Sequence, residues 1–568
     1  MVGKIRKLPR IPPRTPLRHQ RVPSEHCFLS YRVLLDFRSS QQIRMRLQRS
    51  LLLLLRRNHS YITTPIFYAN AAPHLGHLYT VVLADATHRW QKLREPGNIH
   101  VFSTGTDEHG IKIFRAAEKA QKDPLKFCDE TSRKFRDLFQ EFGIVNTEFI
   151  RTTEDRHKRC VEHVWKRLSD SGYIYKDIYA GWYSIVDECF FADADVEDSP
   201  SGKVVKGTQN AVEWVEEQNY MFRLSAFRDK VKQWLLTTDV IRPKHYLQFI
   251  LQDLEWDGDL SISRSRARLP WGIVVPDDDT QTVYVWLDAL VNYLSVIGYL
   301  KTMDVWPPTC QILGKDIMKF HAFYWPAFLM AIELPLPKKL FVHGHWLVDN
   351  AKMSKSVGNV IDPLVAMKSY TTEGLRYFLL KQGLPHGDSN FSREKAINVI
   401  NSDLVNNIGN LLSRATVKKL NPTQKYHDFV PNVLNGDLAD MAGSLLKELT
   451  EIRGRTMQLY DDMLFYKAVE GIIAVVKSGN GFFQFAQPWK LESGEKLDSV
   501  LGLAYETLRM TSILLQPVIP SLASNILTRL GVPPEERQVE QAEFHPTSGG
   551  RHFGPDLGPL LPRITDKS

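Results

Sequence analysis

Two histidines and two lysines are the residues of this sequence best suited to phosphate chemistry. His74 and His77 stand three residues apart, just ahead of an apolar-periodic stretch that runs to Trp90. At the start of a helix this spacing turns both imidazoles the same way, beside backbone N–H groups that have no helical acceptor. Such a corner favours a polyphosphate, and Gly76 leaves room for a stacked base. Taken alone, the pair fits two incidental histidines better.

The lysines belong to the segment Lys352-Met353-Ser354-Lys355-Ser356. Two lysines in a loop of small residues supply mobile point charges, suited to the negative charge that builds on an α-phosphate and on leaving pyrophosphate. An ordinary solvated loop is the alternative for these five residues in isolation. The histidine pair after a first strand and the lysine loop after the second half of the sheet together argue against coincidence.

A parallel α/β sheet is the structure that would position these motifs. The stretch Tyr61–Tyr68 is rich in β-branched and aromatic residues and predicts a buried strand, followed by a turn and the helix to Trp90. A second strand is expected over 98–104, and 105–110 then forms the loop at its carboxyl end, where such sheets bind ligands. The same order returns later, with a strand, a helix and a strand expected at Cys310–Gly314, around His321 and at Phe341–His343.

The rest of the chain divides by its sequence patterns. From about 147 to 277 short aromatic strands alternate with turns, which indicates an insertion, since strand-like chain returns at Thr282–Trp286. After Ser392 the sequence predicts helices as far as about Arg529, and the last residues are rich in Gly and Pro.

Composition and charge separate the N-terminus from the body. With 568 residues, 43% hydrophobic and 24% charged, the chain has the length of three or four domains and the mix of a globular protein, which excludes wholesale disorder and a small disulfide scaffold. The formal net charge is +8, but 14 of the 72 basic residues and two of the 64 acidic ones lie in the first sixty, so the remainder carries a net charge of −4.

An Arg-rich, acid-poor leader of this kind is typical of a mitochondrial transit peptide, and we expect the mature protein in the mitochondrial matrix. Its run Leu51–Leu55 is too short to cross a membrane, so no membrane insertion is expected. A secretory signal and a disordered basic arm are the alternatives, and Met45 is a second possible start.

Cysteine usage predicts a reducing compartment and no structural zinc. The five cysteines include no CxxC pair, and five cannot all form disulfides. They are Cys27, Cys128, Cys160, Cys189 and Cys310.

Five motifs in order resemble one enzyme family, the class I aminoacyl-tRNA synthetases, and most closely their methionyl members of the bacterial and mitochondrial type. The resemblance covers Tyr61 to about Arg529. The motifs are Phe67–His77, Thr104–Gly110, Tyr284–Ala289, Gly314–Ile317 and Ala351–Asn359. The resemblance implies a split Rossmann-type catalytic domain, formation of methionyl-adenylate from methionine and ATP, and transfer of methionine to the 3′ end of mitochondrial tRNA(Met).

On the methionine side, the resemblance implies that Asp107 binds the substrate ammonium. The side-chain pocket would be lined by Ile66, Tyr68, Trp286, Ala289, Tyr293, Ile317 and His321. Without the family, plain core is the better reading of these apolar and aromatic residues. The Tyr293 hydroxyl and a backbone N–H near Ile66 would recognise the weakly accepting thioether sulfur. Leu290 stands where many relatives carry proline.

On the ATP side, the resemblance assigns the phosphates to His74, Gly76 and His77, and the ribose to Gly314 and Asp316. Lys355, with Lys352 behind it, would stabilise the transition state. Magnesium is expected to arrive with ATP, without a dedicated carboxylate cage in the protein.

The aromatic insertion resembles the family's connective peptide without its metal. Zinc-binding members carry paired cysteines there, whereas this sequence has Ser184 and Asp187, with Cys189 alone. The insertion should therefore fold without zinc, and it is too short for the editing domain of the large aliphatic-specific enzymes.

The helical part carries the expected contacts to the tRNA anticodon. Asn410 and Arg414 lie four residues apart on the flank of the apolar stripe of a predicted helix. Trp489, in a predicted loop, has an aromatic ring on which a base can stack. The alternative is that the two polar residues belong to a solvated helix flank and that the tryptophan is half-buried. Without the family resemblance, this alternative is the better interpretation. By resemblance, these three residues read the CAU anticodon.

Taken together, patterns and resemblance predict seven segments and a monomer, with methionine, ATP and tRNA(Met) as partners. The segments are a leader (1–58), the first half of the catalytic domain (59–146), a connective insertion (147–281), the second half (282–345), a stem-contact segment with the lysine loop (346–394), an α-helical anticodon-binding domain (395–545) and a tail (546–568). The rivals are a class I synthetase for another amino acid and an RNA-binding protein that has lost catalysis.

Overall fold

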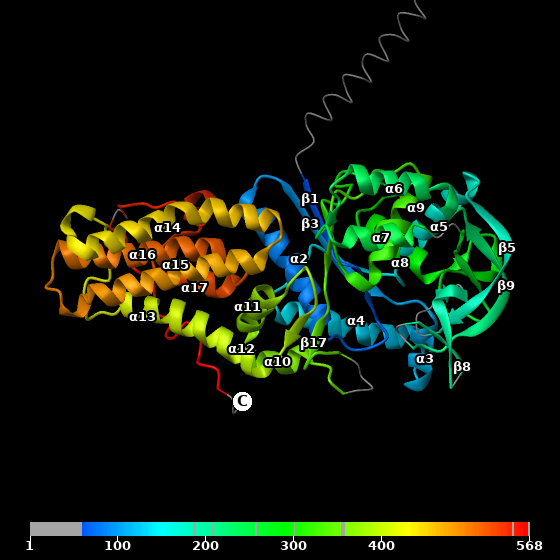
Figure 1. Ribbon diagram of the computed structural model, residues 1–568, viewed down its shortest axis with the longest axis horizontal. Helices are drawn as coiled ribbons and strands as arrows, with labels where there is room; N and C mark the ends of the chain where they lie inside the picture. The colour runs from blue at the N-terminus through cyan, green and yellow to red at the C-terminus, as the bar shows by residue number, and fades with distance from the viewer. Residues whose placement is uncertain are drawn as a thin grey trace, which may run out of the picture. The chain divides into compact units, whose positions relative to one another are not determined.

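The computed structural model describes residues 59–185, 189–191, 193–200, 202–206, 209–255, 258–299, 301–353, 358–547 and 550–565 (Figure 1). The predicted leader, Asp187 and Lys355 lie outside these residues, and of Lys352 and Cys189 only the backbone is described.

A parallel sheet forms the centre of the first half of the chain, as expected. Among the described residues it has seven strands, in the order β10-β16-β15-β1-β3-β2, with β4 also paired to β3. Their bounds are β1 (His59–Thr63), β2 (Phe67–Tyr68), β3 (Ile99–Asp107), β4 (Glu148–Arg151), β10 (Ile241–Arg242), β15 (Cys310–Gly314) and β16 (Leu340–His343). The two predicted halves meet where β1 pairs with β15, so motifs far apart in sequence share one sheet edge.

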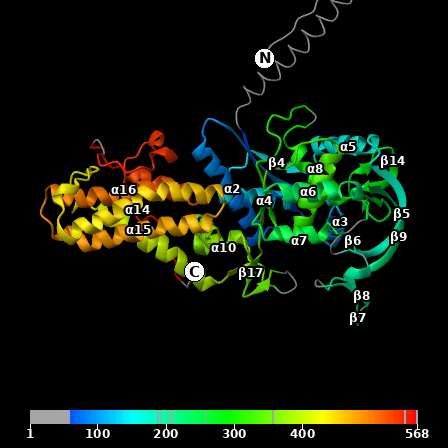
Figure 2. The ribbon, with the colours of Figure 1, turned by 45° about the horizontal axis from the view of Figure 1, so that its top comes forward.

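Helices cover the sheet because their apolar residues have surfaces to pack on. Helix α2 (Leu75–Arg94) is buried on almost every side, since β1, β3 and β15 lie against one side and α11 (Thr372–Gln382) against another. Figures 1 and 2 show α2 between the sheet and the helical part. The other helices of this region are α3 (Ile111–Lys119), α4 (Pro124–Glu141), α5 (Asp155–Asp170), α6 (Arg228–Thr237), α7 (Tyr246–Asp253), α8 (Val285–Ser295) and α9 (Trp325–Ala331), which follows the π-helical turn η4 (Phe320–Tyr324).

The expected insertion is partly antiparallel and partly continuous with the central sheet. Its long strands β5 (Ile174–Ser184) and β9 (Glu213–Phe222) pair with each other. The short strands are β6 (Cys189–Phe191), β7 (Val196–Ser199), β8 (Gly202–Val205), β11 (Leu260–Ser261), β12 (Ser263–Ser265), β13 (Val274–Val275) and β14 (Asp278–Val283). However, β4 and β10 fall within the predicted bounds 147–281 and still join the parallel sheet.

One predicted strand is a strand only in part. The segment Thr282–Trp286 was expected to be strand-like, and its first two residues do end β14, which pairs antiparallel with β12 and β13, but α8 begins at Val285. A short apolar run does not by itself distinguish a strand from the first turn of a buried helix.

The chain after Ser392 is helical to Arg529, as predicted. A small sheet of β17 (Trp346–Val348), β18 (Ala351–Lys352) and β19 (Ser389–Phe391) precedes it, with α10 (Pro363–Tyr370) and α11. The bundle consists of α12 (Arg393–Ile400), the π-helical η5 (Asn401–Gly409), α13 (Asn410–Ala415), α14 (Gly436–Asp461), α15 (Phe465–Ala486), α16 (Glu495–Leu515) and α17 (Pro520–Arg529). No helix in the described part of the chain is long and apolar enough to span a membrane.

The bundle is anchored to the catalytic half through buried polar contacts. The guanidinium of Arg376 in α11 donates to the Asp85 carboxylate of α2 at 2.6 Å, and both side chains are fully buried. The indole of Trp90 donates to Asp461 at 2.9 Å. One hydrophobic core runs from α2 and α4 into the bundle, so the two parts pack as one body.

Candidate functional site

A cavity of about 390 Å³ opens at the carboxyl ends of the parallel strands. The sequence-predicted residues that line it are Ile66, Tyr68, His74, Gly76, His77, Asp107, Trp286, Ala289, Tyr293, Gly314, Asp316, Ile317 and His321. Met353 also lines it, so the lysine segment reaches the cavity as far as it is described. The structure thus gathers the candidate residues in one place, while their individual roles stay predictions.

His74 and His77 form the cap of helix α2. The Nδ1 atom of His74 accepts from the Gly76 N–H at 3.1 Å, and the Nδ1 atom of His77 accepts from the His74 N–H at 3.2 Å. Because both Nδ1 atoms are acceptors, each neutral imidazole carries its proton on Nε2. The rings stack with centroids 3.8 Å apart. The corner therefore combines two Nε2–H donors with the positive end of a helix, an arrangement suited to phosphate oxygens.

Gly76 lies close against the imidazole ring of His74. A Cβ atom at this position would lie 3.0 and 3.1 Å from two atoms of the His74 imidazole. Gly76 also lines the cavity, and the stacking of a base beside it stays a prediction.

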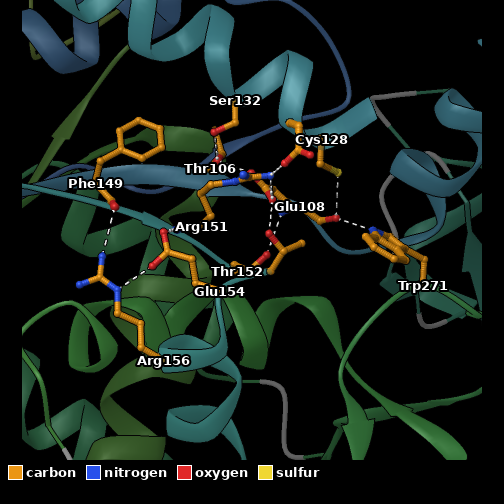
Figure 3. Close-up of polar contacts among 12 residues, drawn as sticks. Thr106, Glu108, Cys128, Ser132, Phe149, Arg151, Thr152, Glu154, Arg156 and Trp271 are labelled. Atoms are coloured by element: carbon orange, nitrogen blue, oxygen red, sulfur yellow. Dashed lines mark hydrogen bonds and ion pairs between the residues drawn. The ribbon is translucent and has the colours of Figure 1, made fainter. Parts of the chain in front are cut away.

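Asp107 ends β3, and a buried network holds the residue that follows it (Figure 3). The carboxylate of Glu108 is fully buried and accepts from Arg151 Nε at 2.7 Å and Nη2 at 2.9 Å. The Glu108 carbonyl accepts from the Trp271 indole at 2.6 Å. These bonds fix the backbone next to Asp107, whose side chain is only 8% exposed at the cavity.

A second buried network joins the loop after Asp107 to helix α8. The Asp288 carboxylate contacts His109 Nδ1 and His157 Nε2, each at 2.6 Å. Burial by itself would raise the pKa of Asp288, but the two imidazoles outweigh it and hold that pKa at about 2. Sequence reasoning matched the motifs that contain His109 and Asp288 without giving either residue a role, because their contact is visible only in the fold.

The apolar end of the cavity is closed by rings from α8 and η4. The hydroxyl of Tyr293 lies 2.7 Å from His321 Nε2, and His321 Nδ1 lies 2.9 Å from the Ile317 carbonyl. Burial lowers the pKa of His321 to about 4, so the ring is neutral at pH 7. Trp286 stacks on Phe320 with centroids 3.5 Å apart.

Another part of the cavity lining is polar. Asp316 Oδ1 lies 3.1 Å from His345 Nε2, and a Cβ at Gly314 would lie 2.6 Å from the same carboxylate oxygen. His343 bonds Thr80 at 3.0 Å, and burial lowers its pKa to about 4. Thr80, His343 and His345 line the cavity but were missed as site residues. Their signal was available, since His343 and His345 lie at the carboxyl end of a predicted strand.

Arg414 and Trp489 come together on the bundle, with Asn410 nearby on the same helix. The Arg414 guanidinium lies over the Trp489 ring at 5.2 Å and donates to Gln484 at 2.8 Å. Trp489, in the 3₁₀ turn η7 (Pro488–Lys490), is 43% exposed, and Asn410 is also exposed. A half-exposed indole with a cation over it is a surface on which an unpaired base can stack.

No group of three or more His, Cys, Asp or Glu residues within the described ranges is arranged to hold a metal ion. Asp187 and the side chain of Cys189 lie outside the described residues, so the absence of zinc from the insertion stays a prediction.

Three comparisons relate the chain to known proteins. The family model "tRNA synthetases class I (M)" matches residues 60–416. The human protein named methionine–tRNA ligase, mitochondrial, is 45% identical over 89% of this chain and 90% of its own length, and the methionine–tRNA ligase of Rickettsia prowazekii is 41% identical over 85% of this chain and 94% of its own length. The solved methionyl-tRNA synthetase of Mycobacterium tuberculosis in complex with methionyl-adenylate superposes with a TM-score of 0.84 at 33% identity, over 89% of this chain and 100% of that one.

Proposed function

Because the chain belongs to the class I tRNA synthetases, in the group of the methionine–tRNA ligases, we propose that its cavity activates methionine with ATP and then passes methionine to the 3′ end of mitochondrial tRNA(Met). The observation that carries this proposal is the combination of groups that line one cavity. A phosphate-binding corner at His74 and His77 and an apolar pocket around Trp286 share one cavity with the Asp107 carboxylate.

In the first step an oxygen of the methionine carboxylate attacks the α-phosphorus, and the bond to the pyrophosphate oxygen breaks. No side chain becomes covalently attached, so the protein acts by placement and electrostatics. Asp107 holds the substrate ammonium, and the Nε2–H groups of His74 and His77 hold phosphate oxygens. Lys355 and Lys352 would add positive charge as pyrophosphate leaves. Gly314 and Asp316 would bind the ribose, with His345 orienting the Asp316 carboxylate.

Methionine is selected by shape and by the polarity of its sulfur. The apolar pocket consists of Ile66, Tyr68, Trp286, Ala289, Tyr293, Ile317 and His321. Since the proton of Tyr293 is committed to His321, the donor toward the thioether would be the backbone N–H near Ile66 rather than the hydroxyl. Ring contacts of the sulfur with Trp286 and Tyr68 add to the preference.

Magnesium would be held by the ATP phosphates. Among the described residues, the carboxylates that line the cavity are Asp107 and Asp316, and the second lies 3.1 Å from a histidine nitrogen. Magnesium commonly keeps several waters and binds through substrate phosphates, so it needs no carboxylate cage from the protein.

The anticodon of tRNA(Met) would contact Asn410, Arg414 and Trp489, supported by the cation and indole surface described above. The seven predicted segments are part of this proposal, except that β4 and β10, which lie within 147–281, belong to the catalytic sheet. Matrix localisation is supported by the Arg-rich leader and by relatives named mitochondrial. The predicted monomer is tested by analytical ultracentrifugation, where a dimer would overturn it.

The test is amino-acid-dependent ATP–pyrophosphate exchange with each of the twenty amino acids, beside a Lys355→Ala variant. Exchange with methionine alone, largely lost in the variant, is the expected result. Exchange with another amino acid would reject the substrate, and folded protein that binds tRNA without any exchange would reject catalysis.

A further inference from the structure

A second, smaller cavity of about 80 Å³ lies between helix α3, the end of strand β5 and the segment after β12. Three arginines line it, Arg115, Arg264 and Arg268, with the single carboxylate Glu213. This cavity is large enough for several waters, and hence for a group of the size of a phosphate. Nothing in the activation of methionine uses it.

Two of these arginines carry buried N–H groups that lack an acceptor. Arg264 is 3% exposed, and its Nη1 donates to the Ser261 and Ser263 carbonyls, yet its Nε has no acceptor among the described residues. Arg268 donates to Glu213 through Nη2 at 3.3 Å, while its Nη1 is buried and, within the same residues, also lacks an acceptor. Buried donors without partners are unfavourable, so the cavity is better satisfied by an anion than by water alone.

Aromatic rings hold both guanidinium groups in place. Arg264 lies over the Tyr284 ring at 4.4 Å and over Phe190 at 4.8 Å, and Arg268 lies over Tyr183 at 5.2 Å. Among the described residues that line the cavity, three positive charges face one negative charge. Planar, immobilised guanidinium groups match the oxygens of a phosphate with paired hydrogen bonds.

The small cavity adjoins the large one through shared elements. On α3, Lys112 lines the large cavity, whereas its neighbour Ile111 and Arg115, one turn on, line the small one. Tyr284, under the Arg264 guanidinium, directly precedes Val285 and Trp286 of the large cavity. The two cavities are therefore lined by neighbouring residues of α3.

We propose that the small cavity lined by Arg115, Arg264 and Arg268, the arginine pocket, binds a phosphodiester of the single-stranded 3′ end of the tRNA. The terminal ribose of the same strand would then lie next to the adenylate in the large cavity. The proposal rests on the proposed function, because only the transfer step needs an RNA strand here. A free polyphosphate such as pyrophosphate offers the same oxygens and is the other source of such a ligand.

The test compares Arg268→Ala and Arg115→Ala with Arg266→Ala, an exposed arginine two residues from Arg268 that does not line the pocket. In aminoacylation, each pocket variant is expected to raise the KM for tRNA by about tenfold, the loss of one charge-assisted hydrogen bond. Arg266→Ala should match the wild type. Methionine-dependent pyrophosphate exchange without tRNA should persist in all three, which separates this proposal from the proposed function.

A second readout identifies the ligand and does not depend on turnover. A single-stranded oligoribonucleotide ending in CCA and inorganic pyrophosphate are each titrated into the wild type and Arg268→Ala, with binding followed by calorimetry. Tighter binding of the oligonucleotide to the wild type supports the proposal. Pyrophosphate binding that depends on Arg268, or oligonucleotide binding that does not, overturns it.

Discussion

The hydroxyl of Tyr293 donates its hydrogen bond to Nε2 of His321, 2.7 Å away, at the apolar end of the large cavity. The direction follows from the other ring nitrogen, since Nδ1 lies 2.9 Å from the Ile317 carbonyl and must carry the proton. The hydroxyl therefore turns an oxygen acceptor, and no donor, toward a bound side chain. This geometry differs from the sequence-based hypothesis, in which the Tyr293 hydroxyl donates to the thioether.

Replacing Tyr293 with phenylalanine should weaken methionine binding. The change leaves His321 Nε2 buried without its donor, a loss of about 1–3 kcal/mol, so we expect the KM for methionine to rise roughly tenfold in pyrophosphate exchange. Tyr175→Phe is the matched control, because its hydroxyl bonds Asp259 outside the cavity. An unchanged KM in Tyr293→Phe would mean that the pair does not shape the pocket.

Gly76→Ala should impair use of ATP. The new methyl group would press on the His74 ring from 3.0 Å, displace an Nε2–H donor, and lower kcat/KM for ATP by about tenfold or more. Gly454→Ala, in an exposed part of α14 with nothing within 4 Å, should leave the kinetics unchanged and raise helix stability by about 0.5–1 kcal/mol. Equal kinetics in the two variants would contradict the assignment of the corner to phosphate binding.

Stability should fall as the pH drops from about 6.5 toward 4. Burial lowers the pKa of His88, His321 and His343 to about 4, so between these pH values the unfolded chain binds protons that the folded chain does not. Their neutral forms therefore contribute full stability above pH 6.5, and that contribution is lost as the pH falls. Each group adds a slope of up to about 1.4 kcal/mol per pH unit.

The pH prediction is checked by thermal unfolding of the wild type and of His88→Gln, which lies in α2 away from the cavity lining. The variant should lose less of its unfolding temperature between pH 6.5 and 4.5 than the wild type. Parallel curves would show that His88 does not titrate as its burial requires.

Trp489→Ala should weaken tRNA binding and leave methionine activation intact. Stacking of one base on an aromatic ring contributes about 1–3 kcal/mol, so the KM for tRNA(Met) should rise about tenfold. With the Trp489→Ala variant, a transcript with a changed anticodon should raise this KM little further. Phe249→Ala, which removes another exposed ring, from α7, serves as the control. If Trp489→Ala still distinguishes tRNA(Met) from the transcript with the changed anticodon, this residue does not read the anticodon.

Local sequence patterns predicted the elements around the cavity because those elements repeat apolar residues at strand or helix spacing. The strands β1, β3 and β15 and the helix α2 were expected from such patterns. The pattern failed in the second half of Thr282–Trp286, where Val285 and Trp286 begin α8. The candidate cavity residues were found through motif resemblance, and the cavity contains every one of them whose side chain is described.

The buried polar networks were beyond sequence reasoning because their partners are remote. Asp288 contacts His157 across 131 positions and His109 across 179. Glu108, Arg264 and Arg268 are charged residues that local patterns would assign to the surface, yet each has a buried N–H or carboxylate group in the fold.

By itself, the sequence determined the order of elements, the motifs and the chemistry that those residue types can perform, because periodicity and side-chain chemistry are local properties. Only the tertiary structure decided which nitrogen of His74, His77 and His321 carries a proton, that the Tyr293 proton goes to His321, and that three arginines line a second cavity. These features depend on the distances between atoms far apart along the chain, and packing of the whole fold sets those distances.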